Sequence, residues 1–486
     1  MLGKLWKSMA KLPCPETSRL SHQVASETVH GANLALRQVT CDVCIEENEV
    51  CKCGHGDIED VQSMVKGKDV DQQAGANSSF LHAVLNMSGM LIAGDNIFYF
   101  TCKAGLGQLS TPYALESGGW ASVFLLVGLG VICTYTSHIL GKCLERNPKS
   151  QSYADIGENA FGRKGRVLAA TIIYLEIFMA LVSYTISLHD NLSTVFAGAQ
   201  LKLPGAKLST SQLITVIAVL IALPSLWLRD LSSISFLSSG GILMSIIIFT
   251  SVVCTAIFGG VKANHTIPML HMQKIPAISG LYIFSYAGHI VFPNLYKAMK
   301  DPSKFTKVSI VSFASVIALY TALAFLGAKL FGPQVNAQIT LSLPQHHFIT
   351  KIALWATVLT PMTKYALEFA PFAIQLEHNL PESVSSRMKL IIRGCVGSIL
   401  LLSILALALS VPYFEHVLSL TGSLVSVCIC VILPSAFYIK LSWPQISRRL
   451  LILNLSVVAF GLLLGVLGTI SSAKLLIKSL LKAHST

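Results

Sequence analysis

The sequence predicts an all-α polytopic membrane protein of about eleven transmembrane helices, and three observations support this fold class. Apolar residues make up 53% of the chain and charged residues only 12%, which is too little charge to cover a large soluble protein. Apolar segments of about 20 residues, enough to cross the hydrocarbon core as a helix, recur along the chain. Two of these segments carry helix-interrupting residues within them.

Eleven apolar segments fit the length of a membrane span. They lie near 80–115, 119–141, 166–188, 209–228, 233–258, 276–297, 306–330, 350–374, 390–411, 414–438 and 450–472. An odd number places the two termini on opposite sides of the membrane. With the N-terminus inside, the inner loops and span ends hold seventeen Lys and Arg residues and the outer side holds nine. Because basic residues favour cytoplasmic loops, we expect the N-terminus to be cytosolic.

The spans divide the chain into a tail, a membrane domain and a short end. We expect a mostly disordered cytosolic tail over 1–77, a transmembrane domain over 78–475 and a short tail over 476–486. The tail contains CDVCIEENEVCKCGH, whose spacing loosely suggests zinc but lacks the usual second cysteine pair. We favour an acidic solvated segment there and expect no metal and no cofactor. The net charge of +12 is attributed to loop topology rather than to nucleic acid binding.

The stretch GLGQLSTPYALESGGW, residues 105–120, predicts a break in the first span. Gly105 and Gly107 lower helix propensity, and Pro112 cannot donate a backbone hydrogen bond. We therefore expect an unwound piece followed by a half-helix that begins near Ser110. Its free N–H groups and positive dipole end suit a carboxylate, with Thr111 beside them. The alternative is a tight glycine packing face or a simple kink.

A second break is predicted in the sixth span, which carries Ser285, Tyr286, Gly288 and His289 in mid-segment. If spans one to five and six to ten form two inverted halves, spans one and six correspond. Interrupted helices at corresponding positions indicate a transporter binding site near the bilayer midplane. The predicted halves cover about 80–258 and 276–440, with an extra helix at about 450–472.

Five stretches of the sequence resemble the amino acid/auxin permease family: LSTPYALESGGW, YADIGENAFG, WLRDLSSISFLSSGG, YAGHIVFPNLYKAM and KIALWATVLTPMTKYAL. Within that family the chain is most similar to the plant-type vacuolar amino acid transporters, which are related to the vesicular inhibitory amino acid transporter. The resemblance covers about 78–475. It implies eleven spans, a 5+5 inverted-repeat fold with broken helices 1 and 6 plus one extra helix, and proton-coupled movement of neutral amino acids.

The chain departs from the family pattern at one place. Members run almost directly from a segment like 86–94 into the equivalent of GLGQLSTPYAL, whereas DNIFYFTCKA intervenes at 95–104. The alternatives are a re-entrant bulge and a misread splice junction, and we favour the second. A genuine insertion would change the geometry of the first break.

Two ionisable residues within spans are candidates for proton coupling, because such residues usually face a cavity or a partner. Glu176 lies about ten residues into the third span. It either loads and releases a proton or stays protonated and hydrogen-bonded to a neighbouring helix. His289 adjoins the second break, and a neutral histidine can both donate and accept hydrogen bonds. The alternative for His289 is polar packing.

We expect a secondary active transporter of amino acids, whose partners are the amino acid substrate, protons and the lipid bilayer. The expected substrate-binding residues are Gly105, Gly107, Ser110, Thr111, Ser285, Tyr286 and Gly288. A transporter-like amino acid sensor that binds without net flux is the alternative. An enzyme is not expected, because His189-Asp190 and His346-His347 have no further catalytic partners in the sequence. The resemblance favours the vacuolar membrane over the plasma membrane.

Overall fold

The structure is a computed structural model that describes residues 80, 83, 84, 87, 104–200, 208–224, 231–259, 261, 264–378 and 384–485. At 104–105, 231–244, 386, 484–485 and several positions between 363 and 378, only the backbone is described. All these residues belong to the second of two compact units, Gly67–Thr486. The predicted tail 1–77 and the predicted insertion, apart from Ala104, lie outside the described residues.

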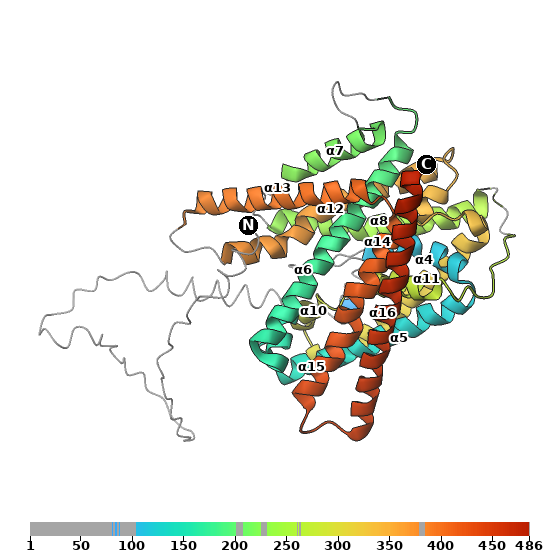
Figure 1. Cartoon of the computed structure of the whole chain (residues 1–486). Helices are drawn as coiled ribbons and strands as arrows, with labels where there is room; N and C mark the ends of the chain where they lie inside the picture. Colours follow the sequence, from blue (N-terminus) through green and yellow to red (C-terminus); the bar gives the residue numbers. More distant parts are fainter. Residues whose placement is uncertain are drawn as a thin grey trace, which may run out of the picture. The chain divides into compact units, whose positions relative to one another are not determined.

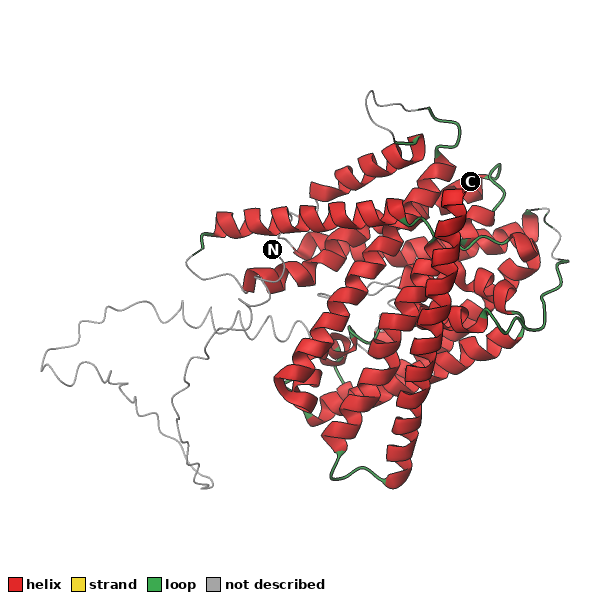
Figure 2. Ribbon diagram, in the orientation of Figure 1, coloured by secondary structure: helices red, strands yellow, loops and turns green. Residues whose placement is uncertain are grey.

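All regular elements of the described residues are helices, which confirms the all-α prediction (Figure 2). The α-helices are α4 (Ala104–Gly118), α5 (Ala121–Arg146), α6 (Tyr153–Val195), α7 (Thr210–Ala222), α8 (Leu231–Phe258), α9 (Ile275–Ser285), α10 (Phe292–Ala298), α11 (Phe305–Phe331), α12 (Phe348–His378), α13 (Ser386–Ser410), α14 (Phe414–Thr421), α15 (Leu433–Ser442) and α16 (Arg448–Ser485). Short helical turns η3 (Pro302–Lys304), η4 (Gly332–Gln334), η5 (Ile339–Ser342), η6 (Gly422–Ser426) and η7 (Cys428–Ile432) join them. Both η6 and η7 are π-helical.

Six helical stretches are long and apolar enough to cross a membrane by length and composition. They are Ala121–Arg146, Tyr153–Val195, Pro302–Gln334, Arg387–Ser410, Phe414–Ser442 and Arg448–Ala483. Shorter apolar helical stretches occur at Thr210–Ala222, Ser245–Phe258, Ile275–Ser285 and Phe348–Met362. Each coincides with a segment predicted from the sequence. Within the described residues, the multi-pass character is therefore clear, and the count of eleven spans stays a prediction.

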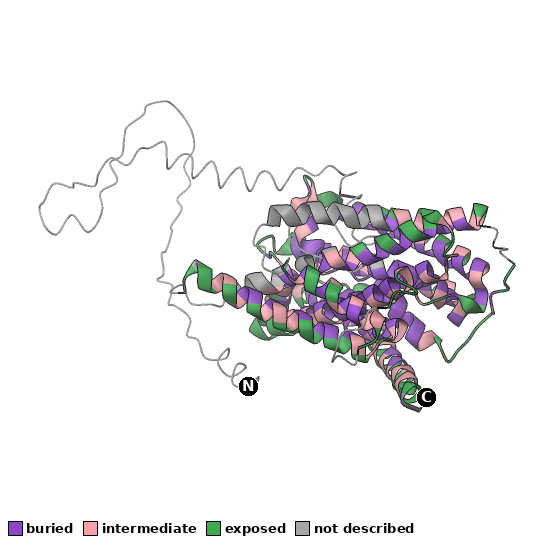
Figure 3. Cartoon of the chain, turned by 90° about the horizontal axis from the view of Figure 1, so that it is seen from above, coloured by how far each residue is buried: buried purple, intermediate pink, exposed green. Residues whose placement is uncertain are grey.

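The helices pack through their shared faces and keep apolar side chains on their outer faces. Figure 3 shows buried positions gathered between the helices and exposed ones on the outside. The helix α16 packs against α9, α14 and α15, with α14, α15 and α16 in the orange and red part of Figure 1. Its outward side chains, such as Leu462, Leu463 and Val466, are exposed and apolar. Such a surface is stable against lipid tails rather than water.

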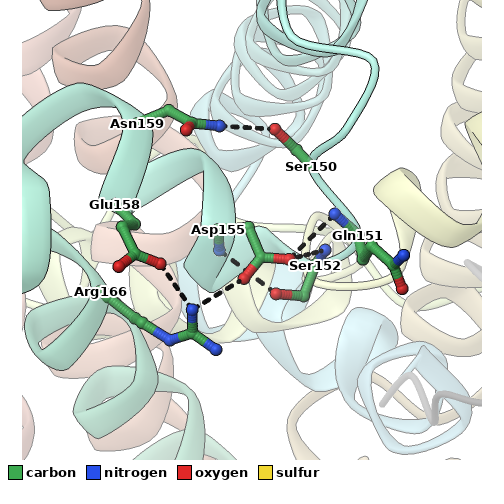
Figure 4. A network of polar contacts seen from close by, with 7 residues as sticks. All are labelled: Ser150, Gln151, Ser152, Asp155, Glu158, Asn159 and Arg166. Carbon is green, nitrogen blue, oxygen red and sulfur yellow. Dashed lines mark hydrogen bonds and ion pairs between the residues drawn. The ribbon is translucent and has the colours of Figure 1, made fainter. Parts of the chain in front are cut away.

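The motif YADIGENAFG forms the start of α6 and a turn within it. Figure 4 shows its polar contacts. The carboxylate of Asp155 accepts hydrogen bonds from the backbone N–H groups of Gln151 and Ser152, at 2.9 Å each. The Ser152 hydroxyl in turn accepts from the N–H of Asp155 at 3.2 Å, which completes a capping box. The motif therefore fixes where α6 begins.

A kink at Phe161 and Gly162 divides α6 into a short first part and a long second part. Gly162 has φ +64°, which glycine adopts without the steric cost of a side chain. The chain bends so that Arg166, beyond the kink, forms ion pairs with Asp155 and Glu158 (Figure 4). These pairs are partly exposed, so each contributes little by itself.

The turn between α10 and α11 is stabilised by Asp301. Its carboxylate accepts hydrogen bonds from the hydroxyl of Ser303 at 2.6 Å and from its N–H at 3.2 Å, and it forms an ion pair with Lys304 at 3.1 Å. The hydrogen bond from the Ser303 hydroxyl, together with Lys304, lowers the pKa of the exposed Asp301 below its ordinary value. The Asp301 carboxylate in this turn therefore stays charged near neutral pH.

The predicted interruption of the sixth span is confirmed. The helix α9 ends at Ser285, residues 286–291 are not helical, and α10 begins at Phe292. Gly288 and His289 lie in this break. The last carbonyl groups of a helix have no hydrogen-bond donor within the helix. One of those at the end of α9, the carbonyl of Ser285, accepts a hydrogen bond from the Tyr320 hydroxyl of α11 at 3.2 Å.

The start of the first half-helix differs from the prediction. The helix α4 begins at Ala104 and continues through Pro112, rather than beginning near Ser110. Gly107 lies against α9 in this helix, so its missing side chain permits close packing and does not unwind the backbone. Tertiary packing overrides the weak helix propensity of glycine. The residues before Ala104 that would form the unwound piece lie outside the described part.

Candidate functional site

The helix α4 meets the second break in space at Gly107 and Ser285. A Cβ atom on Gly107 would lie 2.4 Å from the Ser285 Oγ and 2.5 Å from its Cα. The first turn of α4 therefore lies directly against the end of α9. The arrangement places the first described turn of α4 beside an interrupted helix.

The side chains of α4 at this junction differ in what they bind. The Thr111 hydroxyl donates to the carbonyl of Gln108 at 3.0 Å, which is a bond within its own helix. The Ser110 hydroxyl is 1% exposed and has no hydrogen-bond partner among the described residues. Ser110 is therefore better placed than Thr111 to bind a ligand through its side chain.

Sequence reasoning did not identify Gln108, which adjoins Gly107. Its side chain is 1% exposed, and neither amide atom has a hydrogen-bond partner within the part of the chain that the structure describes. The signal available in the sequence was an amide in the apolar run between Gly107 and Leu109. That signal becomes informative only when the burial is known.

In the second break, the side chains of Ser285 and Tyr286 already have hydrogen-bond partners, so the break offers a ligand mainly its backbone. The Ser285 hydroxyl donates to the carbonyl of Leu281 at 2.8 Å, and the Tyr286 hydroxyl donates to the carbonyl of Leu126 at 3.2 Å. The ring of Tyr286 packs against Tyr320 with centroids 5.8 Å apart. Gly288 is buried and lies outside any helix. We expect the non-helical backbone here to offer ligand contacts, while Tyr286 mainly shapes the wall.

His289 joins the second break to α5. Its Nε2 lies 2.9 Å from the Thr136 hydroxyl and 3.2 Å from the carbonyl of Cys133. Its ring also packs against Phe292, with centroids 4.8 Å apart. The side chain is fully buried, and its Nδ1 has no partner among the described residues. These contacts are what a packing role requires, so they favour the structural alternative for His289.

Glu176 is buried on α6, where it contacts a different span. Its side chain is 1% exposed, and its Oε1 accepts a hydrogen bond from the Ser426 hydroxyl at 2.8 Å. Ser426 belongs to the π-helical turn η6. Such turns within α-helices are frequent at functional sites. The carboxyl group therefore links the long helix α6 to an irregular part of the span that begins at Phe414.

A cavity of about 340 Å³ lies where the predicted outer ends of α6 and α14 approach the loop before α12. Two carboxyl groups, Asp190 and Glu415, take part in its lining. The remaining lining residues are Ser193, Asn336, Ala337, Gln338, Leu341, Pro412, Tyr413 and Phe414. The turn η5 also contacts α4.

The buried amide of Gln338 joins the loop before α12 to α6 through hydrogen bonds. Its Nε2 donates to the Asp190 carboxylate at 2.8 Å, and its Oε1 accepts from the Asn191 amide at 2.8 Å and from the Ser187 hydroxyl. The Thr340 hydroxyl also donates to Oδ1 of the Asn191 side chain at 3.2 Å. Sequence reasoning missed this network because the partners are about 150 residues apart along the chain.

We expect Gln338→Ala to destabilise the protein by about 1–3 kcal/mol, because it leaves buried donors on Ser187 and Asn191 without their acceptor. The effect should appear as a lower apparent unfolding temperature of the detergent-solubilised protein. Gln445→Ala, at an exposed position, is the matched control and should change it little. Equal unfolding temperatures for the two variants would contradict a fastening role.

Among the described residues, no group of three or more His, Cys, Asp or Glu side chains is arranged to hold a metal ion. The cysteine-rich stretch of the predicted tail lies outside these residues.

The helices and the junction define the class: a multi-pass α-helical membrane protein in which an interrupted helix abuts the start of another. The sequence profile of the transmembrane amino acid transporter protein family matches residues 96–474. Amino acid transporter AVT1H of Arabidopsis thaliana is 62% identical over 449 residues, which cover 92% of this chain and 100% of the relative. The chain therefore belongs to the transmembrane amino acid transporter family, as the resemblance predicted.

More distant similarities were also found. The vesicular inhibitory amino acid transporter of Xenopus tropicalis is 25% identical over 402 residues, covering 77% of this chain and 75% of the relative. A solved structure, the inward-facing conformation of Mhp1, superposes with a TM-score of 0.47 at 13% identity, covering 83% of this chain and 91% of that one. The relatives are named as transporters, in agreement with the expectation that the chain is not an enzyme.

Proposed function

We propose that the protein is a secondary active transporter that moves amino acids, neutral ones in particular, across a membrane by alternating access. The observation that carries the proposal is the contact of the α4 start with the interrupted end of α9, at Gly107 and Ser285. Broken helices at corresponding positions bind substrate near the midplane in transporters built from inverted repeats. Membership of the transmembrane amino acid transporter family supports the substrate class.

The proposal includes the finer architecture. Eleven spans, with halves at about 80–258 and 276–440 and an extra helix at about 450–472, place α4 and α9 at corresponding positions. The N-terminus is cytosolic, and the membrane is that of the vacuole, with the plasma membrane as the alternative. The family resemblance and the distribution of Lys and Arg support these assignments.

The substrate site comprises Gly105, Gly107, Ser110 and Thr111 of α4 together with Ser285, Tyr286 and Gly288 of the second break. The N–H groups at the α4 start bind the carboxylate of the substrate, since that helix end carries partial positive charge. Transport is coupled to protons through Glu176, with His289 as the second candidate. The buried position of Glu176 between α6 and η6 supports its choice.

Uptake of labelled neutral amino acids into vesicles that contain the purified protein tests the proposal. We expect net uptake to rise for one orientation of an imposed pH gradient and to fall for the other, and a protonophore should remove both effects. With one-to-one coupling, a gradient of one pH unit supports at most about tenfold accumulation. Saturable binding without net uptake in either orientation would instead establish the amino acid sensor.

A further inference from the structure

The turn η6, which carries the hydrogen-bond partner of Glu176, also lies directly against α9. Its first residue, Gly422, faces Gly280 of α9. A Cβ atom on Gly422 would overlap the carbonyl group of Gly280, with only 2.6 Å to the carbonyl carbon, and a Cβ atom on Gly280 would overlap the backbone carbonyl of Ser419. This contact of backbone with backbone exists because neither glycine has a side chain. At this point no flexible side chain lies between the two elements to absorb a displacement.

A buried hydrogen bond joins α9 to the same span one turn before the glycine contact. The Ser419 hydroxyl of α14 donates to the carbonyl of Ala277 at 2.5 Å, and it lies 2.6 Å from the Ser472 hydroxyl. Ser472 belongs to α16, which therefore joins the same contact. Small residues let helix backbones approach closely in a membrane, and hydroxyl groups hydrogen-bond across such contacts. We therefore expect a displacement of η6 to carry α9 with it.

The other end of η6 binds Glu176. The hydroxyl of Ser426, four residues after Gly422, donates to the Glu176 Oε1 at 2.8 Å. A hydrogen bond to an ionised carboxylate is stronger than one to a neutral carboxyl group, so protonation of Glu176 weakens the hold on Ser426. Because the π-helical register of η6 is much rarer than the α-helical one, this turn has a second arrangement available to it. The turn is therefore an element that the charge of Glu176 can bias.

Other elements packed against α6 carry charged or titratable side chains as well. They are Lys364 and Glu368 on α12, Arg393 on α13, Glu415 and His416 on α14, and Cys428 on η7. Cys428 interacts electrostatically with Glu176, and a thiol is uncharged near neutral pH. These groups influence the pH at which Glu176 titrates, whereas η6 is the element that joins Glu176 to α9.

We propose that η6 transmits the protonation state of Glu176 to the second break, with Gly422 and Gly280 as positioning residues. The inference rests on the proposed function and extends it, because it names the element through which the coupling proton acts on the broken helix. When Glu176 gains its proton, the bond from Ser426 weakens, η6 changes its register and α9 follows through the glycine contact. The end of α9 at Ser285 belongs to the proposed substrate site, so proton and substrate affect each other reciprocally.

Ser426→Ala tests the proposal at the Glu176 end of the turn without adding an atom. We expect exchange of labelled for unlabelled amino acid to persist with unchanged half-saturation. Accumulation driven by one pH unit, at most about tenfold for one-to-one coupling, should fall toward equal concentrations on the two sides. Ser435→Ala, at another buried serine of the same span, is the matched control and should accumulate amino acid as the wild type does.

Gly422→Ala tests the α9 end of the turn and should reproduce the loss of accumulation with retained exchange. Gly461→Ala is its matched control, because a Cβ there would crowd the same span from α16, at 2.9 Å from Ile432 and 3.0 Å from Val431, away from α9. It should accumulate amino acid as the wild type does. If Gly422→Ala fails to insert in the membrane, Ser426→Ala decides alone.

Hydrogen exchange of the backbone amides in 286–291 measures the break without transport. After correction for the intrinsic effect of pH, exchange in the wild type should differ between acid and neutral pH by about fivefold or more, the lower end of usual coupling factors. This difference should disappear in Glu176→Gln and in Ser426→Ala, and it should persist in both controls. A purely structural defect would change exchange at both pH values equally and leave the difference intact.

A wild-type difference between the two pH values in Ser426→Ala overturns the inference and leaves the proposed function standing. So does wild-type accumulation by Ser426→Ala, or a wild type that accumulates amino acid while hydrogen exchange in 286–291 is the same at both pH values. A wild type that accumulates no amino acid under either orientation of the pH gradient overturns the proposed function itself.

Discussion

Gly107→Leu is expected to reduce amino acid uptake by about fivefold to a hundredfold while leaving the protein inserted in the membrane. The first atom of any side chain at this position would lie 2.4 Å from the Ser285 Oγ and 2.5 Å from the Ser285 Cα. A backbone atom cannot rotate away, so α4 must move from α9. Overpacking of this kind costs about 1–3 kcal/mol, and about 1.4 kcal/mol corresponds to a tenfold change. The displacement also separates the two parts of the proposed site.

The smaller substitution Gly107→Ala tests whether steric overlap alone, without a large apolar side chain, reduces uptake. Its Cβ already makes the close contact, so we expect a clear reduction of uptake from a single methyl group. Gly128→Leu is the matched control, because a Cβ on Gly128 in α5 would meet no atom within 4 Å. It should transport as the wild type does. Surface labelling or protease protection checks insertion of all three variants, and near-normal uptake by an inserted Gly107→Leu would contradict the prediction.

The parts of the fold that depend on local sequence were predictable. Apolar length located the helices, and the mid-segment Gly288 located the break between α9 and α10, because glycine weakens a helix. The capping of α6 is similarly local, since Ser152 and Asp155 are three residues apart. In each case the residues that decide the structure are neighbours in the chain.

The parts that depend on distant partners were not predictable. The glycine at position 107 is compatible with an unwound segment or with a close helix contact, and only the position of Ser285 decides for the contact. The amide of Gln108 became a candidate once its burial without a partner was known, and Gln338 once its contacts to α6 were known. The partner of Glu176 is likewise 250 residues away along the chain.

The second large effect is expected for Glu176→Gln, which should remove most pH-driven net uptake while preserving exchange of labelled for unlabelled amino acid. Glutamine keeps the size of the side chain and an oxygen that accepts the hydrogen bond from Ser426, so the contact between α6 and η6 survives. It cannot take up or release the coupling proton. Substrate binding and exchange need the site alone, whereas accumulation against a gradient needs the proton.

Two further variants decide between coupling and structure for Glu176. Glu158→Gln makes the same change at an exposed position of the same helix and should leave pH-driven uptake intact. Glu176→Leu should lower the unfolding temperature as well as uptake, because it leaves the buried Ser426 hydroxyl without its acceptor. If Glu176→Gln accumulates amino acid as the wild type does at every pH, the carboxyl group is structural. The coupling role would then pass to His289, for which the same exchange and accumulation assays on His289→Gln provide the test.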